Sequence, residues 1–175
     1  MMSARRGRSL ILLFLLLALQ VSLFAHLRPF GIAPDLLLTA ALVGGIFGGP
    51  DYGARNGFVA GLALDLVVPG AFGLAAGIYG IFGFGVGTVA RALDPSDPRV
   101  LPVLVGISAF LATGTYGLAL GVLGSEQFVN EALLSTALGV AIGSVLLAGF
   151  LRRGYVWVFG TSGVARTENG PAVVN

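Results

Sequence analysis

The sequence predicts an all-α integral membrane protein, folded as a compact bundle of about six transmembrane helices. Hydrophobic residues make up 56% of the 175-residue chain and charged residues only 10%, and the mean hydropathy is +0.94. Soluble domains carry about 25% charged residues, so a globule of this composition could not cover its surface in water. The chain also contains 28 glycines, more than twice the usual frequency of about 7%, which favours closely packed helices.

The first element is predicted from a basic head, residues 1–8, followed by an apolar run long enough to span a bilayer, residues 9–26. A signal peptide is the alternative, because a basic region precedes the apolar run. The run exceeds the usual apolar core of about 7–15 residues and lacks a good cleavage site. We therefore expect an uncleaved helix in which Gln20 faces another helix. His26 and Arg28 flank its outer end and are expected at the membrane interface.

Two shorter apolar segments follow, at residues 34–49 and 57–68. Pro34 suits the first turn of a helix, and Asp35 suits the electropositive end of that helix. A full span needs about 20 residues, and both segments are shorter. We therefore expect either that they extend into their flanks or that one of them is a re-entrant helix.

One carboxylate, that of Asp65, lies inside the apolar, glycine-rich third segment. Gly57, Gly61 and Asp65 are spaced by four residues, so a helix places them on one face. The carboxylate lies about one turn from the end of the segment, on the outer side, where it meets Asp35 if the second and third segments pack antiparallel. Two interpretations remain open. In the functional interpretation, Asp65 contacts a partner helix or lines a cavity on the outer side. In the structural interpretation, its carboxylate reaches the membrane interface or forms a hydrogen bond with a hydroxyl group inside the bundle.

The second half of the chain predicts three longer helices, at residues 71–93, 100–123 and 132–151, separated by a polar turn and a short polar link. We expect a single membrane domain over residues 9–152 and a cytoplasmic tail over residues 153–175, disordered toward its end. Aromatic residues at the start of this tail are expected to anchor it at the membrane interface. These residues are Tyr155, Trp157 and Phe159.

The arginines orient the predicted bundle. All ten basic residues are Arg, and with six spans and both termini in the cytoplasm only Arg28 lies outside. This distribution agrees with the positive-inside rule. Omitting the second and third segments weakens the bias only slightly, so the orientation is firmer than the helix count. The cytoplasmic arginines are Arg5, Arg6, Arg8, Arg55, Arg91, Arg99, Arg152, Arg153 and Arg166.

Few residues in this sequence could support catalysis or metal binding. The chain has no Cys, which excludes a thiolate metal site or a thiol nucleophile, and its single His excludes a multi-His metal site. The GFGVG run at residues 83–87 is not a dinucleotide fingerprint, because no strand precedes it. The arginines form no basic stripe, so we expect no nucleic-acid partner. We predict a non-enzymatic protein with no catalytic residue, cofactor or metal, in which Tyr79 and Tyr116 serve packing or interhelical hydrogen bonds.

Residues 34–74 carry a more specific pattern. It consists of Pro34 followed by Asp-Leu-Leu-Leu, the glycine-spaced third segment with its Asp65, and the return through Gly70, Phe72, Gly73 and Leu74. This pattern resembles the rod shape-determining protein family MreD. The resemblance covers about residues 9–152; it is specific at 34–74 and only compositional after residue 100. The tail is longer than the family leads us to expect.

The resemblance implies a non-enzymatic scaffold of the bacterial cell-elongation machinery, which builds peptidoglycan at the cell membrane. The implied partners are MreC above all, then MreB and the assembly of RodA with a class B penicillin-binding protein, all at the lipid bilayer. Partner helices would dock through glycine-rich faces. The predicted partner-binding residues are Asp35, Gly57, Gly61, Asp65 and Gly73.

The fold implied by this resemblance is also similar to that of the substrate-binding S components of energy-coupling-factor transporters. A vitamin-binding transporter subunit is therefore the alternative function, with Asp35, Asp65 and His26 at one outer face. Such subunits often carry an Ala-x-x-x-Ala pattern in the first helix. Here residues 10–25 offer only Ala18 and Ala25, seven apart, which counts against transport.

Overall fold

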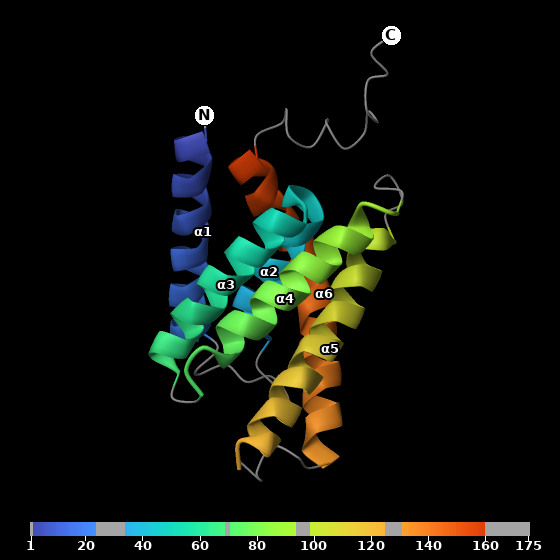
Figure 1. The fold of residues 1–175 in the computed structure, drawn as a ribbon. Coiled ribbons are helices and arrows are strands. Elements are labelled where there is room, and N and C mark those ends of the chain that lie inside the picture. The colour runs from blue at the N-terminus through green and yellow to red at the C-terminus, as the bar shows by residue number, and fades with distance from the viewer. Residues whose placement is uncertain (1, 24–33, 69–70, 94–98, 125–130, 160–175) are drawn as a thin grey trace.

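A computed structural model describes residues 2–23, 34–68, 71–93, 99–124 and 131–159 of the chain (Figure 1). The predicted all-α fold is confirmed for this part, which holds six helices and no strand. His26 and Arg28 lie outside the described residues. The helices are α1 (Met2–Leu23), α2 (Leu36–Gly48), α3 (Pro50–Val67), α4 (Leu74–Ala90), α5 (Val100–Val122) and α6 (Glu131–Phe159).

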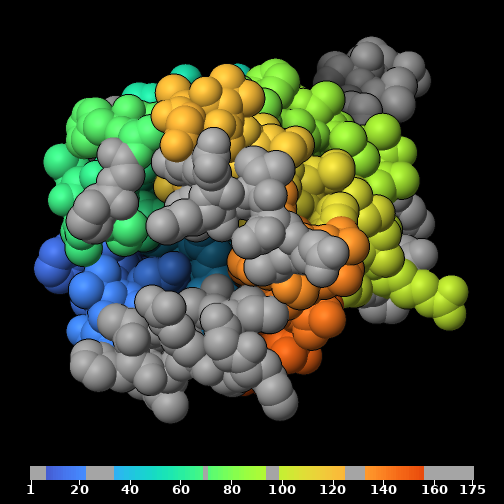
Figure 2. All heavy atoms as spheres, turned by 90° about the horizontal axis from the view of Figure 1, so that it is seen from below, coloured from blue at the N-terminus to red at the C-terminus, as the bar shows by residue number. Residues whose placement is uncertain are grey.

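Helix α2 forms the centre of the bundle. Every side chain from Leu36 to Val43 is at most 1% exposed, and the other five helices all contact α2. In the end-on view of Figure 2, α1, the end of the α3–α4 hairpin, α5 and α6 lie around this centre. A helix that is apolar on all sides is typical of such a buried position. Its 13 residues rise about 20 Å, less than the roughly 30 Å of a bilayer core.

A single residue, Gly49, joins α2 to α3. Its φ of +82° lies in the region that favours glycine, and its N–H donates to the carbonyl of Gly45 at 2.8 Å. Pro50 follows at the first position of α3, where its fixed φ suits a helix. Helix α3 thus extends N-terminally of the predicted segment 57–68, whereas α2 stays short.

Helix α6 is longer than predicted and continues through residue 153, where we placed the start of the tail. The prediction of an interfacial Tyr155 was wrong, because this side chain is only 1% exposed and belongs to the core. Its hydroxyl group has hydrogen-bond partners on α2 and α3, which the bundle can supply and a tail outside it could not. The side chains of Trp157 and Phe159 lie outside the described residues.

Helices α5 and α6 pack against each other along one side of the bundle, and the C-terminal part of α6 crosses toward α1 (Figure 1). Within the part of the chain that the structure describes, two helices are long and apolar enough to cross a bilayer: Val100–Val122 and Leu133–Tyr155, with mean hydropathies of 1.8 and 2.0. Their outward faces are rich in large apolar side chains, as expected for contact with lipid. The exposed residues include Val103, Ile107, Leu111, Leu118, Leu138, Ile142, Leu146 and Phe150.

Candidate functional site at the α3–α4 hairpin

Glycines bring α3 and α4 into backbone contact. Gly53, Gly57 and Gly61 recur every four residues on α3 and are all buried against α4. A Cβ atom at Gly57 would lie 2.6 Å from the carbonyl carbon of Tyr79, and one at Gly61 would lie 2.5 Å from that of Ala75. Cβ atoms essentially never come within 3.0 Å of such atoms. Any larger residue would therefore push the two helices apart.

This contact places the predicted glycine face inside the chain. Helix α4 returns along α3 and covers Gly57 and Gly61, so a partner helix does not reach these residues from outside. A role for Gly57 and Gly61 in partner binding stays a prediction. Within the chain, the two glycines fix the α3–α4 hairpin.

Asp65 caps the N-terminus of α4. Its Oδ2 accepts hydrogen bonds from the N–H groups of Gly73 at 3.0 Å and Ala76 at 3.1 Å, and its Oδ1 accepts one from Ala75 at 3.3 Å. The first N–H groups of a helix have no partner within the helix, and its dipole favours a carboxylate there. Gly73, the N-cap residue with φ +88°, has no side chain to supply the cap itself. The structural interpretation of Asp65 is therefore favoured, with backbone N–H groups as partners instead of hydroxyl groups.

Asp35 caps α2 and links it to two other helices. Its Oδ1 accepts a hydrogen bond from the N–H of Leu38 at 2.9 Å, and its Oδ2 accepts one from the Tyr79 hydroxyl group of α4. Gln20 of α1 donates to Asp35 Oδ1 at 3.5 Å and accepts from the N–H of Leu36 at 2.7 Å. The predictions that Gln20 faces another helix and that Tyr79 makes an interhelical hydrogen bond are both confirmed.

The two carboxylates thus act at the same end of α4. Asp65 binds the first turn of α4, and Asp35 reaches Tyr79, about one turn further along. The two carboxylates are thus linked through α4, to which both are hydrogen-bonded. Both side chains serve helix ends and hold the fold together.

A second polar cluster, which the sequence analysis missed, is buried between α1, α2, α3 and α6. The Asn56 amide donates to the Tyr155 hydroxyl group at 2.6 Å, and this hydroxyl group lies 2.7 Å from the carbonyl oxygen of Ala40. The Ser9 hydroxyl group donates to the side-chain oxygen Oδ1 of Asn56 at 3.0 Å, and the Tyr52 hydroxyl group donates to Ser9 Oγ at 2.8 Å. Asn56 is 5% exposed and Ser9 is 8% exposed. In the sequence, Asn56 was the residue that could have indicated this cluster, since a side-chain amide buried beside an apolar segment needs a hydrogen-bond partner.

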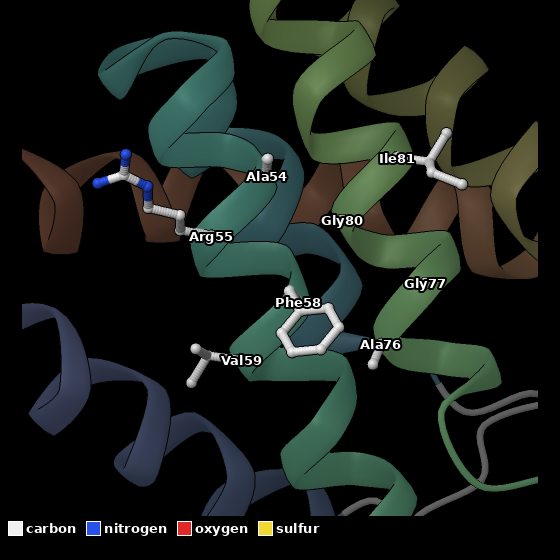
Figure 3. A pocket seen from close by; sticks show the side chains of 8 residues that line it. All are labelled: Ala54, Arg55, Phe58, Val59, Ala76, Gly77, Gly80 and Ile81. Atoms are coloured by element: carbon white, nitrogen blue, oxygen red, sulfur yellow. The ribbon is translucent and has the colours of Figure 1, made fainter.

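The outer surface of the hairpin carries an apolar groove of about 530 Å³ (Figure 3). A Cβ atom at Gly77 would meet nothing within 4 Å, and one at Gly80 would meet only ordinary contacts from 3.4 Å. Phe58 and Ile81 border the groove and are 52% and 70% exposed. In Figure 3 the Phe58 ring lies between α3 and α4. The full lining is Ala54, Arg55, Phe58, Val59, Ala76, Gly77, Gly80 and Ile81.

Apolar outer faces, close packing through small residues and carboxylates confined to helix ends are typical of polytopic helical membrane proteins. Residues 3–158 match the family model of the rod shape-determining protein MreD, so the chain belongs to the MreD family. The predicted family is confirmed. It is a membrane-protein family with a structural, shape-determining role. Neither the curated proteins nor the solved structures contain a match to the chain.

Proposed function

We propose that this chain is a multi-pass scaffold of the bacterial cell-elongation machinery, and that it docks the transmembrane helix of a partner in the α3–α4 groove. Membership of the MreD family supports the role in rod shape. The groove carries the docking proposal, because it combines a floor of small residues with exposed apolar edges. Among the partners that the family suggests, MreC is the proposed occupant. MreB and RodA with a class B penicillin-binding protein belong to the same proposed assembly.

Close helix packing in lipid depends on small residues, because apolar burial gives no advantage there over contact with lipid tails. Gly77 and Gly80 leave the backbone of α4 accessible to a partner helix. Phe58 and Ile81 stand beside this floor and offer large apolar contacts to that partner. The hairpin itself is held by the buried glycine contact, so the groove is formed before the partner binds.

The distribution of charge supports an orientation with both termini in the cytoplasm. The N-terminus of α1, the α2–α3 turn and the C-terminus of α6 lie at one end of the bundle (Figure 1). Asp35 and Asp65 serve helix ends at the opposite end. By the positive-inside rule the arginine-rich end faces the cytoplasm. The described arginines of that end are Arg5, Arg6, Arg8, Arg55, Arg91, Arg99, Arg152 and Arg153.

The docking proposal is tested by filling the groove. In Gly77→Leu the new side chain projects into open space, so the protein should fold as before while the groove is blocked. We expect co-purification of MreC to fall about tenfold, because close helix approach is lost. Gly85→Leu is the matched control: Gly85 lies on the same helix outside the groove, and a Cβ atom there also meets nothing within 4 Å.

Unchanged recovery of MreC with Gly77→Leu would place the partner on another surface. Equal losses with Gly77→Leu and Gly85→Leu would also remove the groove from the mechanism. A rise in melting temperature with a vitamin, together with no recovery of cell-wall proteins, would favour the transporter alternative.

A further inference from the structure

A second hollow, of about 440 Å³, lies between α5 and α6 at the arginine-rich end of the bundle. It is lined by Leu101 of α5 and by Gly149, Arg152 and Arg153 of α6. Both arginine side chains are exposed, and among the residues that the structure describes no acidic side chain lines the hollow. The hollow therefore concentrates positive charge, unlike the apolar groove on the α3–α4 hairpin.

The chemistry of this hollow suits a phosphate group. Guanidinium groups bind phosphate oxygens through paired, charge-assisted hydrogen bonds. Helix α5 begins at Val100, directly before Leu101 of the lining, so the positive end of its dipole lies at the same place. Two arginines and a helix N-terminus thus favour the same kind of anionic ligand.

The surface beside the hollow distinguishes a lipid from a free phosphate ion. Leu146 and Phe150 precede the arginines on α6 and are 75% and 65% exposed, and Val103 follows Leu101 on α5 with 53% exposure. These side chains belong to the two helices that are long enough to cross a bilayer. A free ion would leave this apolar face uncovered, whereas acyl chains attached to the phosphate would lie along it.

We propose that Arg152 and Arg153 bind the phosphate of an anionic phospholipid, whose acyl chains pack along the outer faces of α5 and α6. Basic pockets at the cytoplasmic ends of transmembrane helices are suited to such headgroups. The space beside Gly149 is open, because a Cβ atom at this position would meet nothing within 4 Å, so a larger side chain there would project into the hollow. The site is separate from the α3–α4 groove and does not depend on partner docking.

The test is native mass spectrometry of the full-length protein, purified in detergent, delipidated and then supplied with phosphatidylglycerol or phosphatidylcholine at equal concentration. We expect the wild type to retain phosphatidylglycerol preferentially. Arg152→Gln and Arg153→Gln should each lower this retention about threefold, and the double variant about tenfold, since each arginine near an anionic headgroup contributes to binding. Arg91→Gln is the matched control, because Arg91 is an exposed arginine of the same end outside the hollow.

A second variant keeps the charges and closes the hollow. Gly149→Leu should also retain less phosphatidylglycerol than the wild type. If the double variant does not fold, the retention measured for Gly149→Leu tests the proposal in its place. Wild-type retention in both the double variant and Gly149→Leu would overturn the proposal, and so would equal retention of phosphatidylcholine by the wild type. Displacement of phosphatidylglycerol by about 10 mM inorganic phosphate would identify a free-ion site and overturn the lipid assignment.

Discussion

At the scale of single residues, the carboxylates of Asp35 and Asp65 are explained by the helix ends that they cap. Asp35 caps the helix that it precedes, whereas Asp65 at the end of α3 caps the following helix. The second arrangement is needed because the N-cap residue of α4 is Gly73, which has no acceptor in a side chain. Sequence position placed Asp65 near a helix end correctly. Its partners depended on the fold of the intervening turn, which spacing alone does not determine.

Substitution of Asp65 tests this capping. Asp65→Ala leaves the N–H groups of Gly73, Ala75 and Ala76 without their acceptor, which should cost about 1–2 kcal/mol of unfolding free energy. Asp65→Asn keeps one acceptor oxygen and should therefore lose less unfolding free energy than Asp65→Ala. Denaturant unfolding in detergent, followed by circular dichroism, measures both variants. If Asp65→Ala is as stable as the wild type, the carboxylate does not cap α4.

At the scale of elements, the glycine spacing on α3 was informative about packing and misleading about the contact partner. Small residues spaced by four predicted close helix approach, and the structure has this approach between α3 and α4. The partner is the next helix of the same chain, because a short return after Val68 brings α4 back along α3. Spacing identifies a packing face, and the chain's own topology determines what covers it.

The same hairpin provides a matched pair of substitutions. Gly57→Ala places a Cβ atom against the backbone of Tyr79, which cannot move without displacing α4, so we expect a loss of about 1–3 kcal/mol. Gly77→Ala, on α4, meets open space, and the gain in helix propensity should leave stability unchanged or raise it by up to about 1 kcal/mol. Unfolding of both variants in the same detergent provides the comparison. Equal stabilities would contradict backbone contact at Gly57.

At the scale of the whole molecule, hydropathy predicted the helices and their order, and it missed the buried polar cluster. Asn56 precedes the apolar run that begins at residue 57, so it was left outside the predicted segment although α3 starts at Pro50. Tyr155 follows two arginines and was assigned to the tail, although α6 continues past it. The two side chains meet across the bundle, 99 residues apart in sequence. Local hydropathy contains no information about such a contact.

The central position of α2 raises the question of how α2 and α3 are placed in the membrane. Helix α2 is too short to span a bilayer core by itself, yet other helices enclose it. Under the proposed topology, the α2–α3 turn and the start of α5 face the cytoplasm. The ends of α3 and α5 then face outward. Exposed positions for labelling exist at all four places: Asp51, Val68, Arg99 and Leu123.

Cysteine labelling in intact cells tests this topology, because the chain has no cysteine of its own. A membrane-impermeant maleimide should label Val68→Cys and Leu123→Cys from outside, and it should label Asp51→Cys and Arg99→Cys only after the cells are opened. The reason is that one predicted crossing separates each site from the next along the chain: α3 lies between residues 51 and 68, α4 between 68 and 99, and α5 between 99 and 123. Labelling of Asp51→Cys from outside, with Arg99→Cys still protected, would mean that α2 and α3 form a re-entrant hairpin. The buried glycine contact would then hold α3 of that re-entrant pair against α4.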